Sequence, residues 1–171
     1  MNDHANISIR LARESDNDAL WPILRDVIRV GETYTYDPGL TREASLDLWT
    51  VAPRATYVAE VDGEIMGSYF IKTNQQGGGA HVCNCGYMVA PGARGRGLAA
   101  AMCLHSQAEA LALGYKAMQF NFVVATNLGA VHLWHKLGFE TVGRLPRAFA
   151  HPTQGLVDAL VMYKWLAEDA G

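Results

Sequence analysis

Residues 89–100 read Val-Ala-Pro-Gly-Ala-Arg-Gly-Arg-Gly-Leu-Ala-Ala and stand between two segments of different periodicity. Residues 81–89 form an apolar run typical of a strand, whereas residues 98–113 repeat apolar side chains at helical spacing. Glycines and arginines therefore lie at a strand-to-helix junction. The first N–H groups of a helix lack intrahelical partners and carry partial positive charge, so this junction is suited to binding phosphate oxygens.

The residue types of the junction strengthen this prediction. Gly95 and Gly97 have no side chain that would hold a ligand away from the backbone, and Arg94 and Arg96 can donate charge-assisted hydrogen bonds to phosphate. The spacing matches neither the phosphate-binding loop that ends in Gly-Lys-Ser/Thr nor the three-glycine dinucleotide fingerprint. A glycine turn with two solvated arginines is the alternative interpretation.

The bulk composition predicts a single domain, residues 1–171, without nucleic-acid or membrane partners. The 171 residues suffice for one substantial core, and the net charge of −3 comes without a run of basic residues. No apolar stretch reaches the roughly 18 residues of a membrane helix, and residues 1–4 lack the features of a signal peptide. Three cysteines are too few for a disulfide scaffold, so we expect a cytoplasmic protein.

Periodicity and turn residues predict alternating strands and helices along the whole chain. The clearest feature is a hairpin of residues 55–61 and 64–72, which is closed by Asp62-Gly63. Other strands are expected at residues 8–13, 81–89, 117–125, 139–145 and 156–166, and helices at residues 15–30, 41–50, 98–113 and 127–137. Residues 32–40, which include Tyr34 and Tyr36, form a predicted loop between the first two helices.

Residues 89–99 resemble the pyrophosphate-binding motif of the GCN5-related N-acetyltransferase (GNAT) superfamily, in which an Arg/Gln-x-x-Gly-x-Gly/Ala loop joins the central strand to a helix. Residues 127–139, Asn-Leu-Gly-Ala-Val-His-Leu-Trp-His-Lys-Leu-Gly-Phe, resemble a second motif of that superfamily, Asn-x-x-Ala…Tyr-x-x-x-Gly-Phe. The resemblance implies an α/β (α+β) acyl-CoA N-acyltransferase fold, in which a mixed central sheet with splayed central strands is flanked by helices. It also implies that residues 32–40 wall the acceptor pocket, although surface tyrosines over a core edge remain an alternative.

The resemblance implies acetyl-CoA as cosubstrate and a small amine as acceptor. Homodimers are frequent among such proteins, so a homodimer is possible here. The cofactor-binding residues carried over are Met88, Val89, Arg94, Gly95, Arg96, Gly97, Leu98, Ala99, Ala100, Asn127 and Trp134. A backbone N–H near Met88 or Val89 would polarise the thioester carbonyl, and the amine would attack it directly in a ternary complex.

Two asparagines stand inside predicted strands, Asn84 and Asn121. Alternation places Asn84 on one strand face with Val82, Gly86 and Met88. An amide on a core strand needs hydrogen-bond partners, and the superfamily fold separates the two strands that carry these residues. We predict both as catalytic residues that orient the acceptor amine and its neighbouring carboxylate or carbonyl; core asparagines satisfied by backbone are the alternative.

The opposite face of that strand carries His81, Cys83 and Cys85, which suggest a metal site at first sight. Residues four apart on a strand lie about 13 Å from each other, whereas zinc holds its ligands within about 2.3 Å. We therefore predict no metal and interpret the cysteines as packing residues.

The sequence departs from the superfamily pattern at Trp134, where many members carry a tyrosine that protonates the departing CoA thiolate. An indole N–H donates hydrogen bonds but has no useful acidity, so Trp134 is expected to pack against the pantetheine arm or the core. His132 and His135 do not replace the tyrosine convincingly. Tyr34, Tyr36, Tyr87 and an ordered water remain alternative proton donors.

A narrower resemblance links residues 31–34, 81–87 and 119–121 to yeast N-acetyltransferases that act on proline analogues such as azetidine-2-carboxylate. It implies substrate-handling roles for the asparagines at positions 84 and 121. The expected function is acetyl transfer to a small molecule, such as an amino acid or proline-like imino acid. A protein or peptide N-acetyltransferase and a non-catalytic acyl-CoA-binding module are the competing hypotheses.

Overall fold

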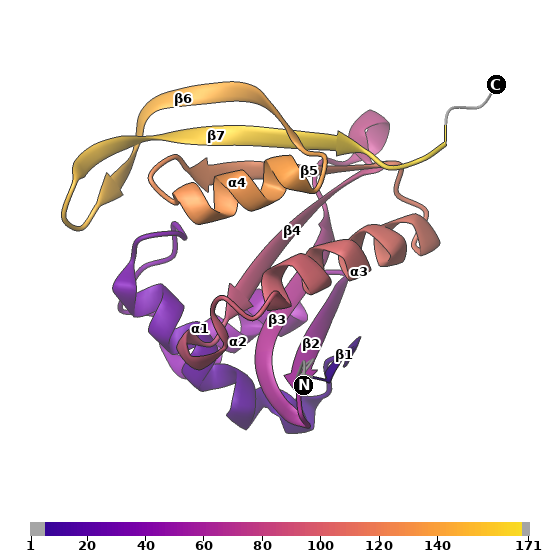
Figure 1. The fold of residues 1–171 in the computed structure, drawn as a ribbon, viewed down its shortest axis with the longest axis vertical. Coiled ribbons are helices and arrows are strands. Elements are labelled where there is room, and N and C mark those ends of the chain that lie inside the picture. The colour runs from indigo at the N-terminus through magenta and orange to yellow at the C-terminus, as the bar shows by residue number, and fades with distance from the viewer. Residues whose placement is uncertain (1–5, 169–171) are drawn as a thin grey trace, which may run out of the picture.

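The computed structural model describes residues 6–168, and the expectation about a signal peptide in residues 1–4 lies outside them. A seven-stranded sheet with the order β1-β2-β3-β4-β5-β7-β6 forms the centre of the protein (Figure 1). The strands are β1 (Ile7–Leu11), β2 (Ala55–Val61), β3 (Glu64–Thr73), β4 (Val82–Val89), β5 (Ala117–Val124), β6 (Glu140–His151) and β7 (Gly155–Trp165). The helices are α1 (Asn17–Val30), α2 (Arg42–Leu46), α3 (Leu98–Ala112) and α4 (Leu128–Lys136).

The sheet is split at its middle, between β4 and β5. Strands β1 to β4 pair antiparallel, as do β5, β7 and β6. The parallel ladder between β4 and β5 contains only the pairs Val82 with Ala117 and Cys83 with Met118. Beyond these pairs the two strands run apart, as Figure 1 shows. The predicted mixed sheet with splayed central strands is therefore confirmed.

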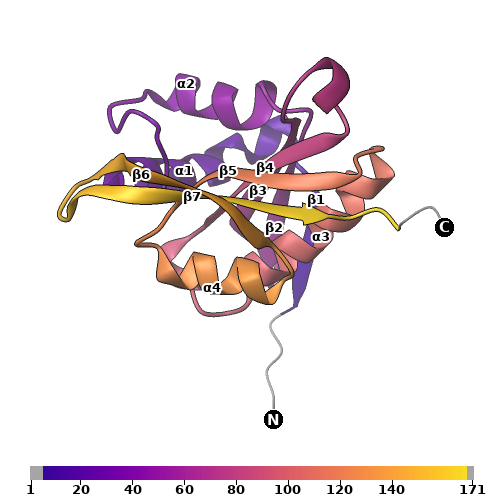
Figure 2. The same ribbon diagram turned by 90° about the horizontal axis from the view of Figure 1, so that it is seen from above.

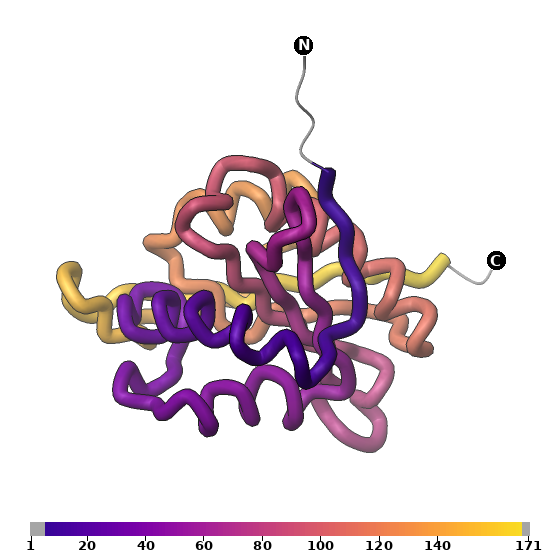
Figure 3. The backbone as a smooth tube through the Cα atoms, turned by 90° about the horizontal axis from the view of Figure 1, so that it is seen from below, coloured from indigo at the N-terminus to yellow at the C-terminus, as the bar shows by residue number. Residues whose placement is uncertain are grey.

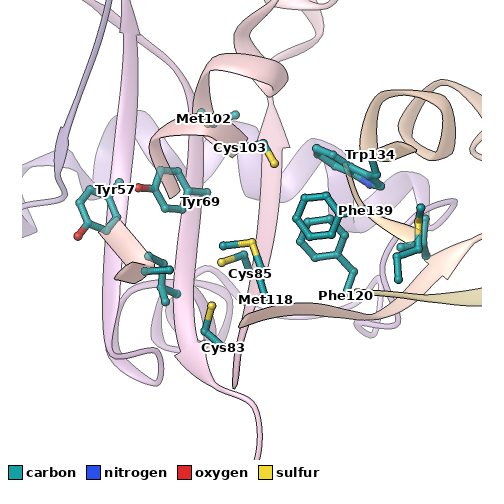
Figure 4. Close-up of a cluster of buried hydrophobic side chains, with 14 of the residues drawn as sticks. Tyr57, Tyr69, Cys83, Cys85, Met102, Cys103, Met118, Phe120, Trp134 and Phe139 are labelled. Atoms are coloured by element: carbon teal, nitrogen blue, oxygen red, sulfur yellow. The ribbon is translucent and has the colours of Figure 1, made fainter. Parts of the chain in front are cut away.

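Helices cover the two faces of the sheet in pairs. Figure 2 shows α1 and α2 on one face and α3 and α4 on the other, and Figure 3 shows α2 beside α1. Side chains of α1 pack with Val58 of β2, Phe70 of β3 and Met88 of β4, which lie on the same face of the sheet. The larger cluster under α3 and α4 includes Cys83 and Cys85, so these two cysteines are core residues, as predicted (Figure 4).

Local sequence signals explain most element boundaries. Helix α1 ends at Gly31, whose φ of 67° is the left-handed conformation that glycine adopts without strain. The hairpin between β2 and β3 turns at Asp62 and Gly63, which both have positive φ, as its sequence predicted. Thr41 caps α2 by accepting a hydrogen bond from Ala44 N, at 3.2 Å.

The helix expected over residues 41–50 is present, as α2 followed directly by a π-helical turn, Asp47–Val51. One predicted boundary was wrong. Strand β6 was expected to end at Leu145, before a proline, yet it extends to His151. A register shift between Leu145 and Phe149 accommodates that proline, and Arg147 there has a φ of 53°. Among the described residues, none of the helices has the length and apolar content of a membrane span.

Candidate active site

A cavity of about 920 Å³ occupies the region where β4 and β5 separate. Its walls come from the end of α1, the loop after it, β3, β4, β5, the start of α3, and α4. Every predicted site residue except Arg96 lines this cavity. The split in the sheet thus brings together the loop of residues 89–100, the two strand asparagines and the aromatic loop.

One end of the cavity is the junction between β4 and α3. The first backbone hydrogen bond of α3 runs from Ala101 N to Gly97 O, at 3.0 Å. The amides of Leu98, Ala99 and Ala100 consequently have no intrahelical acceptor, and all three residues line the cavity. These exposed N–H groups and the helix dipole favour an anionic group at this position.

Gly95 and Gly97 allow a ligand to approach this helix start. Their φ values are 75° and 79°, and a Cβ placed on either residue would meet no protein atom within 4 Å. The side chain of Arg94 lines the same part of the cavity, whereas Arg96 lies outside and faces Asp62 at 3.8 Å. The loop therefore fits the pyrophosphate of an acyl-CoA, with Arg94 rather than Arg96 as its cationic side chain.

The hydrogen bonds at the two ends of β4 determine where its peptide groups point. Asn74 N donates to Val82 O at 2.9 Å, and Ala90 N donates to Met66 O at 2.8 Å. No register shift interrupts the β3–β4 ladder between these points. Because peptide groups alternate along an antiparallel strand, those of even-numbered residues face β3 and those of odd-numbered residues face β5.

Pairing with β5 stops at Cys83, so the later odd-numbered peptide groups of β4 point into the gap. Tyr87 and Val89 each present an N–H group there. The Met88 amide points toward β3, and its side chain is buried under α1 with 2% exposure. Between the two residues predicted to polarise a thioester carbonyl, the geometry favours Val89.

Asn84 lies where β4 and β5 begin to separate. Its Nδ2 donates to Gln119 O on β5 at 2.9 Å, so the side chain replaces the next bond of the interrupted ladder. Its Oδ1 accepts no hydrogen bond from the described residues and is not sealed from solvent. The alternative of an asparagine satisfied by backbone thus holds for the donor, while the acceptor oxygen is open to the cavity.

Asn121 also lines the cavity, on β5 two residues after Gln119, whose carbonyl binds Asn84. Gln119 Nε2 donates to Asn121 Oδ1 at 2.9 Å, and Asn121 Nδ2 donates to Asn74 Oδ1 at 2.7 Å. These bonds hold the exposed amide in place at the cavity wall. A substrate group that contacts Asn121 would join an existing chain of amide groups.

Stacked tyrosines from the loop after α1 form one wall of the cavity. The rings of Tyr34 and Tyr36 lie 5.5 Å apart, and Tyr34 Oη donates to Tyr87 O at 2.8 Å. The loop can approach β4 this closely because position 86 is a glycine. Both tyrosines also pack against the core under α1, so the loop combines the pocket wall and the core edge that the sequence left as alternatives.

Trp134 packs in the core and lines the cavity. Its ring lies 5.2 Å from that of Tyr87 and 5.1 Å from that of Phe120, and it is 8% exposed (Figure 4). Asn127, the other predicted cofactor residue from this motif, accepts a hydrogen bond from Ala130 N at 3.4 Å and so caps α4.

The candidate proton donors differ in what their hydroxyl groups already bind. Ser106 Oγ donates to Cys103 O at 2.7 Å, so in the 2.6 Å contact between Tyr87 and Ser106 the tyrosine is the donor. Tyr34 donates to Tyr87 O. Burial raises the pKa of Tyr34, Tyr36 and Tyr87 above the ordinary value for a phenol. All three therefore stay protonated near pH 7, and the hydroxyl protons of Tyr34 and Tyr87 are already donated to protein oxygens.

Sequence reasoning missed two contributors to the cavity on β3, Phe70 and Lys72. It also missed Gly86 as the residue that gives Phe70 and Tyr34 their room. Alternation would have placed positions 70 and 72 on one face. The register against β4, which pairs Lys72 with Asn84, depends on the assembled sheet. Among the described residues, no group of three His, Cys, Asp or Glu side chains could hold a metal ion.

A helix start open to phosphate, beside a parallel strand pair that separates after two residue pairs, defines an acyl-CoA-dependent acyltransferase. Residues 21–139 match the model of the Acetyltransferase (GNAT) family, so the chain belongs to that family. It is an acetyl-CoA-dependent N-acetyltransferase, and acetyl-CoA is its cosubstrate.

Known proteins agree with this assignment. The structure of a GCN5-related N-acetyltransferase from Kribbella flavida has 43% sequence identity and a TM-score of 0.88, and covers 94% of this chain and 98% of its own. The Salmonella typhimurium protein yncA, solved with its cofactor acetyl-CoA, shares the fold with a TM-score of 0.83 at 20% identity, covering 98% of each chain. N-acetyltransferase aca1 of Schizosaccharomyces pombe is 29% identical in an alignment 153 residues long, which covers 78% of this chain and 72% of the relative. This relative is a yeast enzyme, in loose agreement with the narrower resemblance, and its name specifies no acceptor.

Proposed function

We propose that this N-acetyltransferase transfers the acetyl group to the amine of a small molecule, in the class of amino acids and proline-like imino acids. The observation that carries the proposal is the shape of the cavity. It passes through the gap in the sheet, from the phosphate-binding helix start to a wall of stacked tyrosines. A concave pocket with a wall of aromatic side chains suits a compact acceptor better than an extended peptide.

The reaction follows from groups that the cavity presents. The pyrophosphate binds the amides of Leu98, Ala99 and Ala100 together with Arg94, and the pantetheine arm follows β4 along the gap. The N–H of Val89 donates to the thioester oxygen and stabilises the negative charge that develops during attack. No covalent enzyme intermediate is required.

The acceptor must reach the thioester as a neutral amine. Deprotonating an amine with a pKa near 10.4 costs roughly 4.6 kcal/mol at pH 7. Holding the amine and the thioester in line can lower the activation barrier by about 7–11 kcal/mol, which is more than this cost. In this proposal Asn84 Oδ1 accepts from the amine N–H, and Asn121 contacts the polar group beside it. As the C–N bond forms, the C–S bond of the thioester breaks and CoA leaves as a thiolate, which takes up through water the proton that the amine gives up. The neighbouring tyrosines remain neutral.

Thiol release from acetyl-CoA in the presence of single amines tests the function. We expect release with small amino or imino acids, azetidine-2-carboxylate included, and little release with a peptide N-terminus. Preferred acetylation of peptides would support the protein-modifying alternative. Acetyl-CoA binding without release for any amine would support a non-catalytic binding module.

Variants of the phosphate loop test the cofactor assignment. Arg94→Ala should weaken acetyl-CoA binding by about 10-fold or more, because a charge-assisted hydrogen bond contributes about 1.5–3 kcal/mol. Gly97→Glu should weaken it further by placing a carboxylate at the helix start. Arg96→Ala is the matched control, because Arg96 lies outside the cavity. Equal affinities for the Arg94 and Arg96 variants in calorimetry would refute the assignment.

A further inference from the structure

Lys72 is a cation at the end of the cavity away from the phosphate loop. It lies on β3 directly opposite Asn84 of β4, so the two side chains share a sheet face and the cavity wall. Its Nζ lies over the ring of Phe70, 5.4 Å from the centroid, and that ring also lines the cavity. The ammonium group is therefore directed along the cavity wall.

No protein group neutralises this ammonium. Among the described residues, no carboxylate oxygen lies within 4.0 Å of Lys72 Nζ, and the group donates no hydrogen bond to them. The cavity has one carboxylate in its lining, Glu32, and that residue makes no ion pair with Lys72. Lys72 is an exposed residue that lines the cavity and has no ion-pair partner among the described residues, so its ammonium group is available to a ligand.

The two cations of the cavity lie far apart along β4. Arg94 follows the end of the strand beyond Val89, while Lys72 pairs with Asn84 at its beginning. Val89 lies five residue steps along the extended strand from Asn84, a span of about 17 Å. If Arg94 binds the pyrophosphate, Lys72 is too far away to bind it as well and is available to an anionic group on the acceptor side of the thioester.

We propose that Lys72 binds the carboxylate of the acceptor, so that the preferred acceptors are amines with an acid group close to the reacting nitrogen. This inference rests on the proposed small-molecule function. Directly opposed side chains on paired strands have Cβ atoms about 4.5–5.5 Å apart. If Asn84 Oδ1 holds the amine, Lys72 reaches an acid group only one or two carbon atoms away. That spacing selects α-amino and α-imino acids.

Pairs of acceptors that differ only in the carboxylate charge test whether Lys72 recognises that charge. Each α-amino or α-imino acid of a panel, azetidine-2-carboxylate and proline included, is compared with its own carboxamide. For Lys72→Met we expect kcat/KM to fall about 10- to 100-fold with the acid and to stay nearly constant with the carboxamide. For each compound we compare kcat/KM of the variant with kcat/KM of the wild type, so differences in amine pKa between compounds do not affect the comparison.

Two further variants and two further measurements exclude a structural explanation. Lys72→Arg keeps the charge and should retain most of the activity with acids, while Lys116→Met removes an exposed lysine outside the cavity and should behave as wild type. The melting temperature and the acetyl-CoA affinity of Lys72→Met should equal those of the wild type. An equal loss with acids and carboxamides, or no loss with acids, would overturn the inference.

The same panel of acceptors shows whether only the inference about Lys72 is wrong or the proposed function as well. If wild type acetylates small amines but prefers carboxamides or amines without an acid group, Lys72 does not select carboxylates and the small-molecule function stands. If wild type binds acetyl-CoA and acetylates no small amine, the proposed function itself is wrong, and the role of Lys72 falls with it.

Discussion

Replacement of Gly86 by alanine should destabilise the protein and impair the acceptor side of the cavity. An added Cβ would lie 2.7 and 2.9 Å from Phe70 Cε1 and Cζ, and 3.0 Å from Tyr34 Oη. Carbon atoms normally approach to about 3.5–4.0 Å, so these groups must move. The Phe70 ring is 4% exposed and packs edge-on against Trp49 at 4.9 Å, so it has little room to move.

The magnitude follows from two opposing effects. Overpacking of a core typically costs about 1–3 kcal/mol. Alanine in place of a strand glycine recovers about 0.5–1 kcal/mol of backbone entropy. The expected net loss is about 1–2 kcal/mol, which corresponds to a decrease in melting temperature of roughly 2–8 °C for a chain of this size.

Calorimetry and steady-state kinetics together test this prediction. Displacement of Tyr34 should break its hydrogen bond to Tyr87 O, so KM for the acceptor should rise while acetyl-CoA affinity stays close to wild type. Gly143→Ala is the matched control, because its Cβ would meet Val161 at an ordinary 3.6 Å. If Gly86→Ala were as stable as Gly143→Ala, with an unchanged acceptor KM, the argument about close packing would be wrong.

Three other changes have defined outcomes. Arg10 donates two hydrogen bonds to Asp16 and lowers the pKa of that carboxyl. The ionised carboxylate therefore stabilises the folded protein above about pH 4, and this stabilisation is lost as the pH falls through the folded-state pKa. Asp16→Asn should therefore lower the free energy of unfolding in urea at pH 7, and the difference from wild type should shrink in acid; a constant difference would contradict the linkage. Asn127→Ala should cost about 1 kcal/mol through loss of the α4 cap, and Asn127→Asp should restore it in the same assay, whereas equal losses would argue against capping. Trp134→Phe should leave kcat nearly unchanged because the indole N–H transfers no proton, and a tenfold decrease would assign that group a role.

Local chemistry was sufficient to predict much of the fold from the sequence. The β2–β3 hairpin is specified by two residues that tolerate positive φ, and the end of α1 by one glycine. The strand-to-helix junction of residues 89–100 was likewise predictable, because its glycines and the helix start are adjacent in the chain. These features depend on a few neighbouring residues, so a single sequence contains the information.

The parts that were missed depend on distant segments meeting. Arg94 and Arg96 have the same chemistry in the sequence, and only the path of the loop directs one into the cavity and the other toward Asp62. The partner of Asn84 is a backbone carbonyl 35 positions away, and Lys72 reaches the site through strand register. Side-chain alternation alone could not determine these pairings.

The length of β4 imposes a constraint on how this site can change. The strand carries the loop of residues 89–100 at one end and Asn84 near the other, so in the proposed mechanism its length sets the distance between the bound pyrophosphate and the acceptor amine. One inserted residue would exchange the two sheet faces of every position beyond it, turning Asn84 toward the α3 side and a core cysteine toward the acceptor. Strand β4 can therefore lengthen only by two residues at a time, about 6.6 Å for each step, and such a step would require a much longer pantetheine arm. A strand of fixed length ties this chain to one class of carrier, while the loop after α1 remains free to vary with the acceptor.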